Sequence, residues 1–318
     1  DREGEFEPVV VPKHQSRGLS IERLVISLYA KGMSVSDIES EMQEIYGINL
    51  STSAISIITN KVSQAASEWQ NRPLESLYMI VWMDGIVFKV RENGKVINKT
   101  VYLCVGLNKD GLKEVLGMWV GKNESAAFWM GVLTDLKARG VENILVTVTD
   151  NLNGFTETIK SVFPSSTTQI CVVHQIRNSC RYVVWKEKKE FTSDLKNIYN
   201  APTKEAAKME LDNFEQKWGS KYPYAIRSWR NNWEELTVFF DFPVEIRKII
   251  YTTNLIENLN GKIRKYTKNK LSFPNDDALK KSVYLAITEI EKKWYQPIWN
   301  WALIFNQFIT IFENRIQV

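Results

Sequence analysis

The stretch Val81-Trp82-Met83-Asp84-Gly85-Ile86 decides the fold class, because it places a carboxylate inside a nearly continuous apolar run from Tyr78 to Val90. Such a run is typical of a strand that is buried on both faces. A carboxylate within it is costly unless it is paired, hydrogen-bonded or bound to a metal ion. The sequence therefore predicts an α/β protein in which Asp84 is either a buried hydrogen-bonding group or part of a functional site.

The segments around this stretch predict a mixed five-stranded sheet with flanking helices. Asn93-Gly94 is typical of a hairpin turn, so the first strands are antiparallel. A helix from Asn123 or Ser125 to about Arg139 precedes the fourth strand, and a right-handed crossover would place that strand beside the first. The strands are expected at Tyr78–Val90, Thr100–Leu107, Leu112–Val120, Ile144–Thr149 and Gln169–Val173.

Helical periodicity dominates the rest of the chain. Residues 18–72 predict three short helices, with Ser36 capping the second and Ser51 or Thr52 the third. Such a segment is either a helix-turn-helix-like DNA-binding module or a plain helical bundle. Further helices are expected, after an extended lead-in over 1–17, at 155–162, within an amphipathic region 176–240, from Pro243 through Leu259, at about 275–293, and as core at 297–316.

Composition narrows the function classes. The 318 residues are 44% apolar, and the chain contains only two histidines and three cysteines. The scarcity of histidine excludes a His-rich zinc enzyme, and a Ser-His-Asp hydrolase would depend on His174 without a G-x-S-x-G motif. No window approaches 18 apolar residues, so we expect no membrane span, and an odd number of cysteines suits the reducing cytoplasm. The net charge of +4 is too small to prove a polyanionic partner.

Two further acids complete a candidate metal site. Asp150 ends the fourth strand, so it converges with Asp84 if these strands are neighbours; alone, it would be a helix N-cap. Glu257 lies near the apolar face of a helix, where a structural glutamate would be a solvated surface residue. Asn254, one turn before it, and Asn258, beside it, are expected to be neighbours of the site. Three carboxylates can hold two Mg²⁺ ions about 3.5–4 Å apart, which is the arrangement of phosphodiester chemistry. That hypothesis also explains the lack of histidine bases.

A basic run follows Glu257 directly. Its position beside the proposed metal site favours contacts with a nucleic-acid backbone, although cations at a helix end also suit the helix dipole. Arg177 belongs to a second basic patch that is diluted by acids. The run contains Lys262, Arg264, Lys265, Lys268 and Lys270.

Cys171-Val172-Val173-His174 has the spacing of half a zinc site, with Cys180 as a third possible ligand. No fourth histidine or cysteine lies nearby in the sequence, so no zinc is expected. We expect Cys171 to be buried in the fifth strand. His174 would then form a hydrogen bond at the end of that strand or lie beside the metal site.

In combination these motifs resemble the mutator-type DDE transposases of bacterial insertion sequences. The resemblance implies an RNase H-like core in residues 73–175 and 241–318, interrupted by an all-helical insertion at 176–240. It also implies that Asp84, Asp150 and Glu257 form the metal triad. Asn151 departs from the glycine common in the family. The resemblance rests on Asp84-Gly85, Thr149-Asp150 before Asn-x-x-Gly-Phe, Cys171-x-x-His174-x-x-Arg177-Asn178, and Thr252-Thr253-Asn254-x-Ile256-Glu257-x-x-Asn260-x-x-x-Arg264.

The leading expectation is therefore a DNA transposase that acts on double-stranded DNA and uses two Mg²⁺ or Mn²⁺ ions. Because two element ends must be brought together, a homodimer or larger assembly is expected. Two other functions remain open: a non-catalytic, transposase-derived DNA-binding protein, and a general RNase H-like nuclease.

Overall fold

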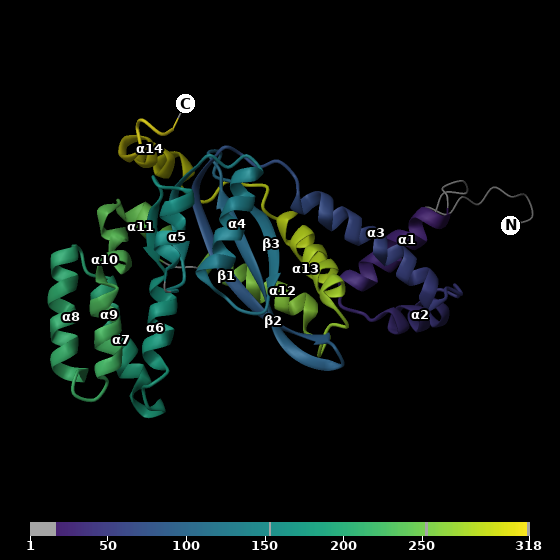
Figure 1. Cartoon of the computed structure of the whole chain (residues 1–318), viewed down its shortest axis with the longest axis horizontal. Coiled ribbons are helices and arrows are strands. Elements are labelled where there is room, and N and C mark those ends of the chain that lie inside the picture. Colours follow the sequence, from purple (N-terminus) through teal and green to yellow (C-terminus); the bar gives the residue numbers. More distant parts are fainter. Residues whose placement is uncertain (1–16, 153, 252–253, 317–318) are drawn as a thin grey trace, which may run out of the picture.

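The centre of the protein is one mixed five-stranded sheet with the order β3-β2-β1-β4-β5 (Figure 1). The computed structural model describes residues 17–316, except residues 153 and 252–253. β1 is antiparallel to β2 and parallel to β4, so the predicted position of the fourth strand beside the first is confirmed. This sheet and its flanking helices are consistent with an RNase H-like core. The strands are β1 (Leu77–Glu92), β2 (Lys95–Leu107), β3 (Lys113–Gly121), β4 (Asn143–Thr149) and β5 (Thr167–Ile170).

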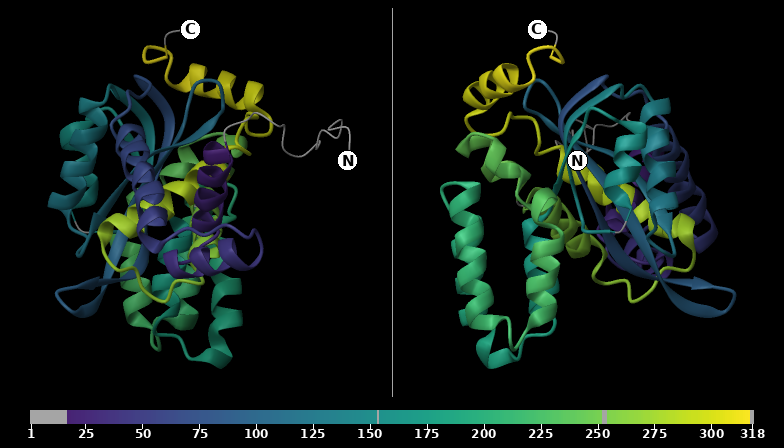
Figure 2. Two further views of the ribbon diagram at one scale, coloured as in Figure 1. Left: turned by 90° about the vertical axis from the view of Figure 1, so that its right-hand side faces the viewer. Right: turned by 60° about the vertical axis from the view of Figure 1, so that its left-hand side comes forward.

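Helices surround the sheet in three groups (Figures 1 and 2). At one end lie α1 (Arg17–Ala30), α2 (Val35–Glu44) and α3 (Thr52–Gln70). On the sheet lie α4 (Ala126–Ala138), α5 (Phe155–Val162), α12 (Asn254–Thr267) and α13 (Asp276–Glu291). At the other end lie α6 (Val172–Cys180), η1 (Trp185–Glu187), α7 (Lys188–Tyr199), α8 (Lys204–Trp218), α9 (Pro223–Asn231), α10 (Trp233–Leu236), η2 (Val238–Asp241) and α11 (Val244–Ile250), with α14 (Trp301–Ile311) above them. In the described part of the chain, no helix combines the length and hydropathy needed to cross a membrane.

Alternation along β1 gives the two faces of the sheet different partners. Val81 and Met83 are fully or almost fully buried in a cluster with residues of α4 and α5. Trp82 and Ile86 belong to the larger cluster on the opposite face, which includes residues of α12 and α13. Asp84 is two residues from both Trp82 and Ile86, so its side chain is on the same face of the sheet, which α12 covers.

The fifth strand is shorter than expected. β5 ends at Ile170, and Cys171 is the N-cap of α6, with its Sγ accepting from the backbone N–H of His174 at 3.5 Å. The Cys171 N–H still bonds to Thr149 O at 2.8 Å, whereas the Val172 N–H bonds to Tyr251 O at 3.2 Å. The apolar run from Gln169 to Val173 therefore contains a strand end and a helix start, which hydropathy alone does not separate.

Other boundaries also differ from the expectations. Ser34, not Ser36, caps α2, because its hydroxyl accepts from the Asp37 N–H in a capping box. Ser51 caps α3 as one of the two predicted alternatives. The helix expected from Pro243 through Leu259 is divided into α11 and α12. The last helix is not simply core, since Trp299 just before α14 is 85% exposed. The predicted lead-in lies almost wholly outside the described residues.

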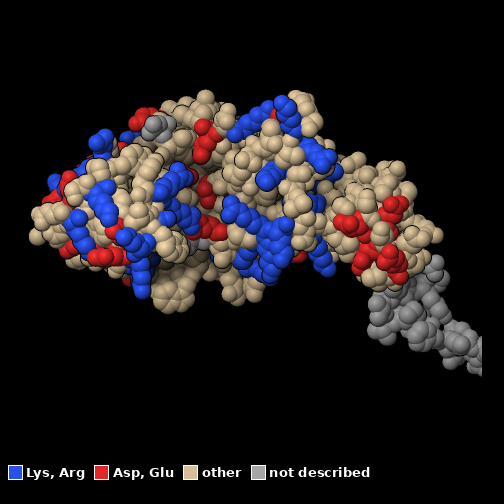
Figure 3. Space-filling view, turned by 90° about the horizontal axis from the view of Figure 1, so that it is seen from below, with Lys and Arg blue, Asp and Glu red and all other residues tan. Residues whose placement is uncertain are grey.

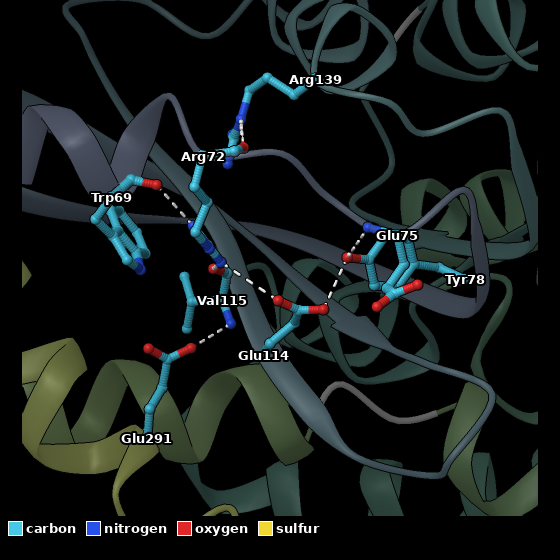
Figure 4. A network of polar contacts seen from close by, with 8 residues as sticks. All are labelled: Trp69, Arg72, Glu75, Tyr78, Glu114, Val115, Arg139 and Glu291. Atoms are coloured by element: carbon cyan, nitrogen blue, oxygen red, sulfur yellow. Dashed lines mark hydrogen bonds and ion pairs between the residues drawn. The ribbon is translucent and has the colours of Figure 1, made fainter.

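Arg72 ties the end of α3 to the edge strand β3 (Figure 4). Its guanidinium donates to Trp69 O at 2.8 Å and to Val115 O at 2.7 Å, while its carbonyl accepts from Arg139 Nε at 3.0 Å. Glu291 of α13 accepts from the Val115 N–H at 2.7 Å. Because β3 is an edge strand, these side chains satisfy backbone groups that no further strand pairs, and they join α3, α4 and α13 to the sheet.

Candidate metal centre

Asp84, in the middle of β1, and Asp150, just after the end of the parallel strand β4, come together. Trp82 of β1 pairs with Val148 of β4, and each acid lies two residues further along the sequence from one member of this pair. One ligand atom from each of Asp84, Asp150 and His174 lies within 4.8 Å of the others. The structure therefore places side by side the two carboxylates whose convergence the strand order predicts.

His174 lies between these two carboxylates. Its Nδ1 is in direct contact with Asp150 Oδ1, and its Nε2 is 3.9 Å from Asp84 Oδ1. The residue is in the first turn of α6, rather than at the end of a strand, and the Cys171 cap fixes where that helix begins. The expectation that His174 is a polar neighbour of the site agrees with this geometry.

Contacts before and after α12 lay that helix against the C-terminal half of β1, which extends beyond the pairing with β4. Before it, Trp82 Nε1 donates to Ile249 O at 3.2 Å. After it, Phe273 exchanges backbone hydrogen bonds of 2.8 Å with Lys89 and Arg91 of β1. Within α12, buried residues recur at helical spacing and face the core, while Glu257 and Asn260, which follow two of them, act on Asp84. The buried residues are Ile256, Leu259 and Ile263.

Glu257 is placed near the acid pair but is bound to an arginine. Its Oε1 is 2.8 Å from Arg177 Nη1, which comes from α6. The metal-binding group formed by Asp84, Asp150 and His174 does not include it. The negative charge of Glu257 nevertheless contributes to raising the pKa of Asp84. Glu257, the third predicted acid, is thus close enough to Asp84 to affect its pKa, and its carboxylate is paired with Arg177.

Asn260 is the asparagine of α12 that contacts the acid pair. Its Nδ2 donates to Asp84 Oδ2 at 2.7 Å, and the Gly85 N–H donates to Asp84 Oδ1 at 2.8 Å. Asn258, which we expected beside the site, is exposed, and the side chain of Asn254 lies outside what the structure describes. Asn260 is one helical turn after Glu257, so the i,i+3 spacing was the available signal.

A fourth carboxylate, which the sequence analysis did not single out, lies near Asp150. Burial raises the pKa of Glu124, a hydrogen bond from Trp129 Nε1 at 2.9 Å opposes that shift, and the charge of Asp150 adds to it. The residue directly precedes Ser125, the N-cap of α4. The sequence signal for Glu124 was its position, just before the crossover helix that leads to the strand ending at Asp150.

Burial and charge perturb both titratable partners at the centre. Burial, with the charge of Asp150, raises the pKa of Asp84 to about 7, while His174 opposes this shift. Burial by itself lowers the pKa of His174, but contacts with Asp150 and Cys171 outweigh it and raise the pKa to about 11. The metal-free centre therefore holds a protonated imidazole between two acids at neutral pH.

This geometry predicts that His174→Ala destabilises the metal-free protein by about 2 kcal/mol at pH 6, because a charged hydrogen-bonding partner of Asp150 is lost. A histidine whose pKa is raised by folding stabilises the folded state fully below its unfolded pKa of 6.5, and this contribution is lost as the pH rises to about 11. The difference from the wild type should therefore shrink between pH 7 and 10.

Thermal unfolding in EDTA across that pH range measures the effect. His14→Ala, at the other histidine of the sequence, is the matched control. An equal loss of stability at every pH would contradict the assignment of a protonated His174.

The donor atoms of the centre suit a divalent cation such as Mg²⁺ or Mn²⁺. Asp84 and Asp150 offer hard carboxylate oxygens, which these ions prefer. Asn260 Oδ1 is buried and has no hydrogen-bond partner among the residues that the structure describes, which is unusual for a buried amide oxygen. The soft Sγ of Cys171 instead accepts from a backbone N–H and caps α6.

Positively charged side chains lie on both sides of acidic ones on the face seen in Figure 3. Lys270 differs from the rest of the predicted basic run: its ammonium is 4.1 Å from the centre of the Tyr29 ring and donates to Ser282 Oγ at 3.0 Å. Four members of the run are exposed, three of them on α12 and Lys268 just after its end, and they remain open to a polyanion: Lys262, Arg264, Lys265 and Lys268.

The α1–α3 group presents less positive charge. Lys61 is the only cationic residue between positions 34 and 70, and its ammonium is 2.6 Å from Glu22. Glu39 Oε1 accepts from the Thr52 N–H at the start of α3, at 3.2 Å. A red group at that end of the molecule in Figure 3 agrees with this balance. DNA contact by residues 18–72 stays a prediction.

Comparison with known proteins now decides the family. Residues 1–297 match the sequence model described as "Transposase, Mutator family". The chain belongs to the Mutator family of transposases. A probable transposase for an ISRM3-like insertion sequence element of Sinorhizobium fredii is 42% identical over 316 residues, which are 99% of this chain and 79% of that protein.

Further relatives of this Mutator-family chain carry similar names. The transposase for insertion sequence element ISRM3 of Rhizobium meliloti is also 42% identical, with the same coverage of 99% and 79%. A probable insertion sequence transposase of Corynebacterium diphtheriae is 40% identical over 294 residues, covering 92% of this chain and 86% of that protein. The resemblance inferred from the motifs is thereby confirmed at the level of the family.

Proposed function

We propose that this chain is a divalent-metal-dependent DNA transposase. It would hydrolyse a phosphodiester at each end of its mobile element, and the freed 3′-OH would then attack a phosphodiester of target DNA. The observation that carries the proposal is the group formed by Asp84, Asp150 and His174 in a Mutator-family chain. A buried and a partly buried carboxylate side by side on neighbouring parallel strands suit phosphoryl chemistry and serve no evident packing purpose.

The proposed metal ligands are Asp84, Asp150 and Glu257, which would hold two Mg²⁺ or Mn²⁺ ions. Bound ions would supply Lewis-acid activation of the attacking oxygen and stabilisation of the leaving one. The protein's own contribution is orientation. His174 holds Asp150, backbone and amide donors hold Asp84, and Arg177 holds Glu257.

The DNA would lie across the face that contains α12. We assign backbone contacts to Arg177, which is exposed, and to the exposed cations of α12. Residues 176–240 form the proposed helical insertion of the RNase H-like core, and residues 18–72 a helix-turn-helix-like module. Joining two element ends requires at least two catalytic sites, so the working form is proposed to be a homodimer or larger.

A triple substitution at Lys262, Lys265 and Lys268 to alanine should weaken binding to duplex DNA of any sequence. Each lost phosphate contact removes nearly one unit from the slope of log K against log salt. Fluorescence anisotropy at several salt concentrations measures both effects. Lys217→Ala is the matched control, because that ammonium is 2.6 Å from Glu190 and 2.7 Å from Asp194. An unchanged salt slope would show that these lysines do not contact phosphate.

Cleavage of labelled duplexes with and without the element's terminal sequences tests the function itself. A transposase cuts only the substrate with ends, and only with a divalent ion. A general nuclease cuts both substrates. A non-catalytic DNA-binding protein binds the ends but cuts neither.

A further inference from the structure

Asn260 holds one oxygen of the central carboxylate in a buried contact. The residue is 7% exposed, and its Nδ2 donates to Asp84 Oδ2 at 2.7 Å. The Gly85 N–H donates to the other oxygen of Asp84 at 2.8 Å. Each carboxylate oxygen has two lone pairs, so these donors fix the plane of the group and leave acceptor capacity on both atoms. Asn260 thus decides how Asp84 faces Asp150 and His174.

The other end of the same amide has no hydrogen-bond partner. Asn260 Oδ1 is buried, and no donor among the described residues bonds to it. Leaving a buried acceptor unsatisfied is costly, and native proteins do so at few positions. Because one amide group carries both atoms, this oxygen lies within about 5 Å of Asp84 Oδ2. An unsatisfied oxygen so close to the acid pair points to a ligand that binds between them.

Amide oxygens of asparagine are ordinary ligands of hard divalent cations, together with carboxylates. The helix also supports this assignment, since α12 places Asn260 one turn after Glu257, on the side that faces β1. A purely structural amide would satisfy both of its ends within the protein. Here only the end that orients Asp84 is satisfied.

We propose that Asn260 is a component of the metal centre, in which Nδ2 orients Asp84 and Oδ1 supplies a further oxygen ligand to the cation or to water in its shell. This inference rests on the proposed function, because it assumes that the acid pair binds a divalent ion. It assigns to the centre a neutral residue that lies outside the three predicted acids.

Calorimetric titration of the full chain with Mn²⁺, without DNA, tests the inference. Asn260→Ala should weaken Mn²⁺ binding about 10-fold or more, which is the usual effect of removing a group that orients a ligand. Asn258→Ala is the matched control on the same helix, because that side chain is exposed, and it should bind Mn²⁺ as the wild type does.

The variant Asn260→Asp distinguishes a metal-binding role of Asn260 from a purely structural one. It keeps the oxygen but replaces the donor with an acid facing Asp84, so its melting temperature in EDTA should fall. Mn²⁺ should then raise its melting temperature by more than it raises that of the wild type. A merely structural asparagine predicts no such additional gain.

The outcomes distinguish this inference from the proposed function. If the wild type binds Mn²⁺, Asp84→Asn does not, and Asn260→Ala binds as the wild type does, the inference about Asn260 is overturned while the metal centre stands. If the wild type and Asp84→Asn bind Mn²⁺ equally weakly, the proposed metal centre itself is wrong.

Discussion

Asp84→Asn is expected to abolish cleavage of DNA that carries the element's ends while leaving DNA binding intact. The substitution keeps the shape of the side chain and an oxygen that can accept from Asn260, but it removes the negative charge that a divalent cation requires. The basic surface of α12 is untouched, so affinity for DNA should not change. A gel assay of cleavage and an anisotropy titration, on the same preparation, measure the two properties.

The same substitution should stabilise the metal-free protein. Raising the pKa of Asp84 from 3.8 to about 7 makes its ionised form costly by up to about 4 kcal/mol above pH 7. The favourable contribution of the neutral acid is complete below pH 3.8 and is lost as the pH rises to about 7. In EDTA, the variant should therefore melt above the wild type at pH 8, and the two should converge near pH 4.

Asp110→Asn is the control for both measurements, because Asp110 is an exposed residue in the turn between β2 and β3. Full cleavage by Asp84→Asn would refute a catalytic centre at Asp84. A lower melting temperature at pH 8 would show that the carboxylate is a structural group.

Glu257→Gln should also eliminate cleavage, but with a different metal-binding result. Asp84, Asp150 and His174 form a ligand group without Glu257, so one ion should still bind. The second ion requires the third carboxylate, so the Mn²⁺ stoichiometry should fall from two to one in the presence of DNA. Glutamine still accepts from Arg177, and because the arginine side is exposed the ion pair contributes only about 1 kcal/mol, so folding should be preserved.

Calorimetry and single-turnover cleavage of the same variant decide between one ion and two. Glu142→Gln, at an exposed acid before β4, serves as the control. Wild-type stoichiometry together with normal cleavage would remove Glu257 from the centre. Loss of both ions would show that Glu257 is needed to build the first site as well.

Strand order and the convergence of the first two acids were predictable, because each depends on local signals and one topological rule. An apolar run with Asp84 in its middle indicates a buried strand, and a crossover helix carries the chain back to the strand that ends at Asp150. Turn residues agreed with those signals: Asn93 and Gly94 adopt the positive φ values that a tight hairpin requires. Continuous apolar runs, turn residues and the handedness of the crossover therefore sufficed for the order of the sheet.

The immediate surroundings of the acids were harder to predict. Whether Asn258 or Asn260 meets Asp84 depends on the rotation of α12 about its axis, which contacts with Trp82, Lys89 and Arg91 set from outside the helix. The start of α6 depends on a cap by Cys171 that hydropathy does not reveal. In the sequence, Lys270 could not be told from the other cations of its run, but in the structure its ammonium packs over the Tyr29 ring.

The sequence by itself determined the kind of sheet, the positions of the acids on it and the family to which their spacing corresponds. Those features follow from apolar runs, turn residues and the spacing of motifs, which can each be recognised in a short stretch of sequence. Only the tertiary structure decided that Arg177 holds Glu257, that His174 separates Asp84 from Asp150, and that Asn260 has an unsatisfied oxygen. Each of these contacts joins elements distant in sequence, and their geometry is set by how α6 and α12 pack beside the middle of β1.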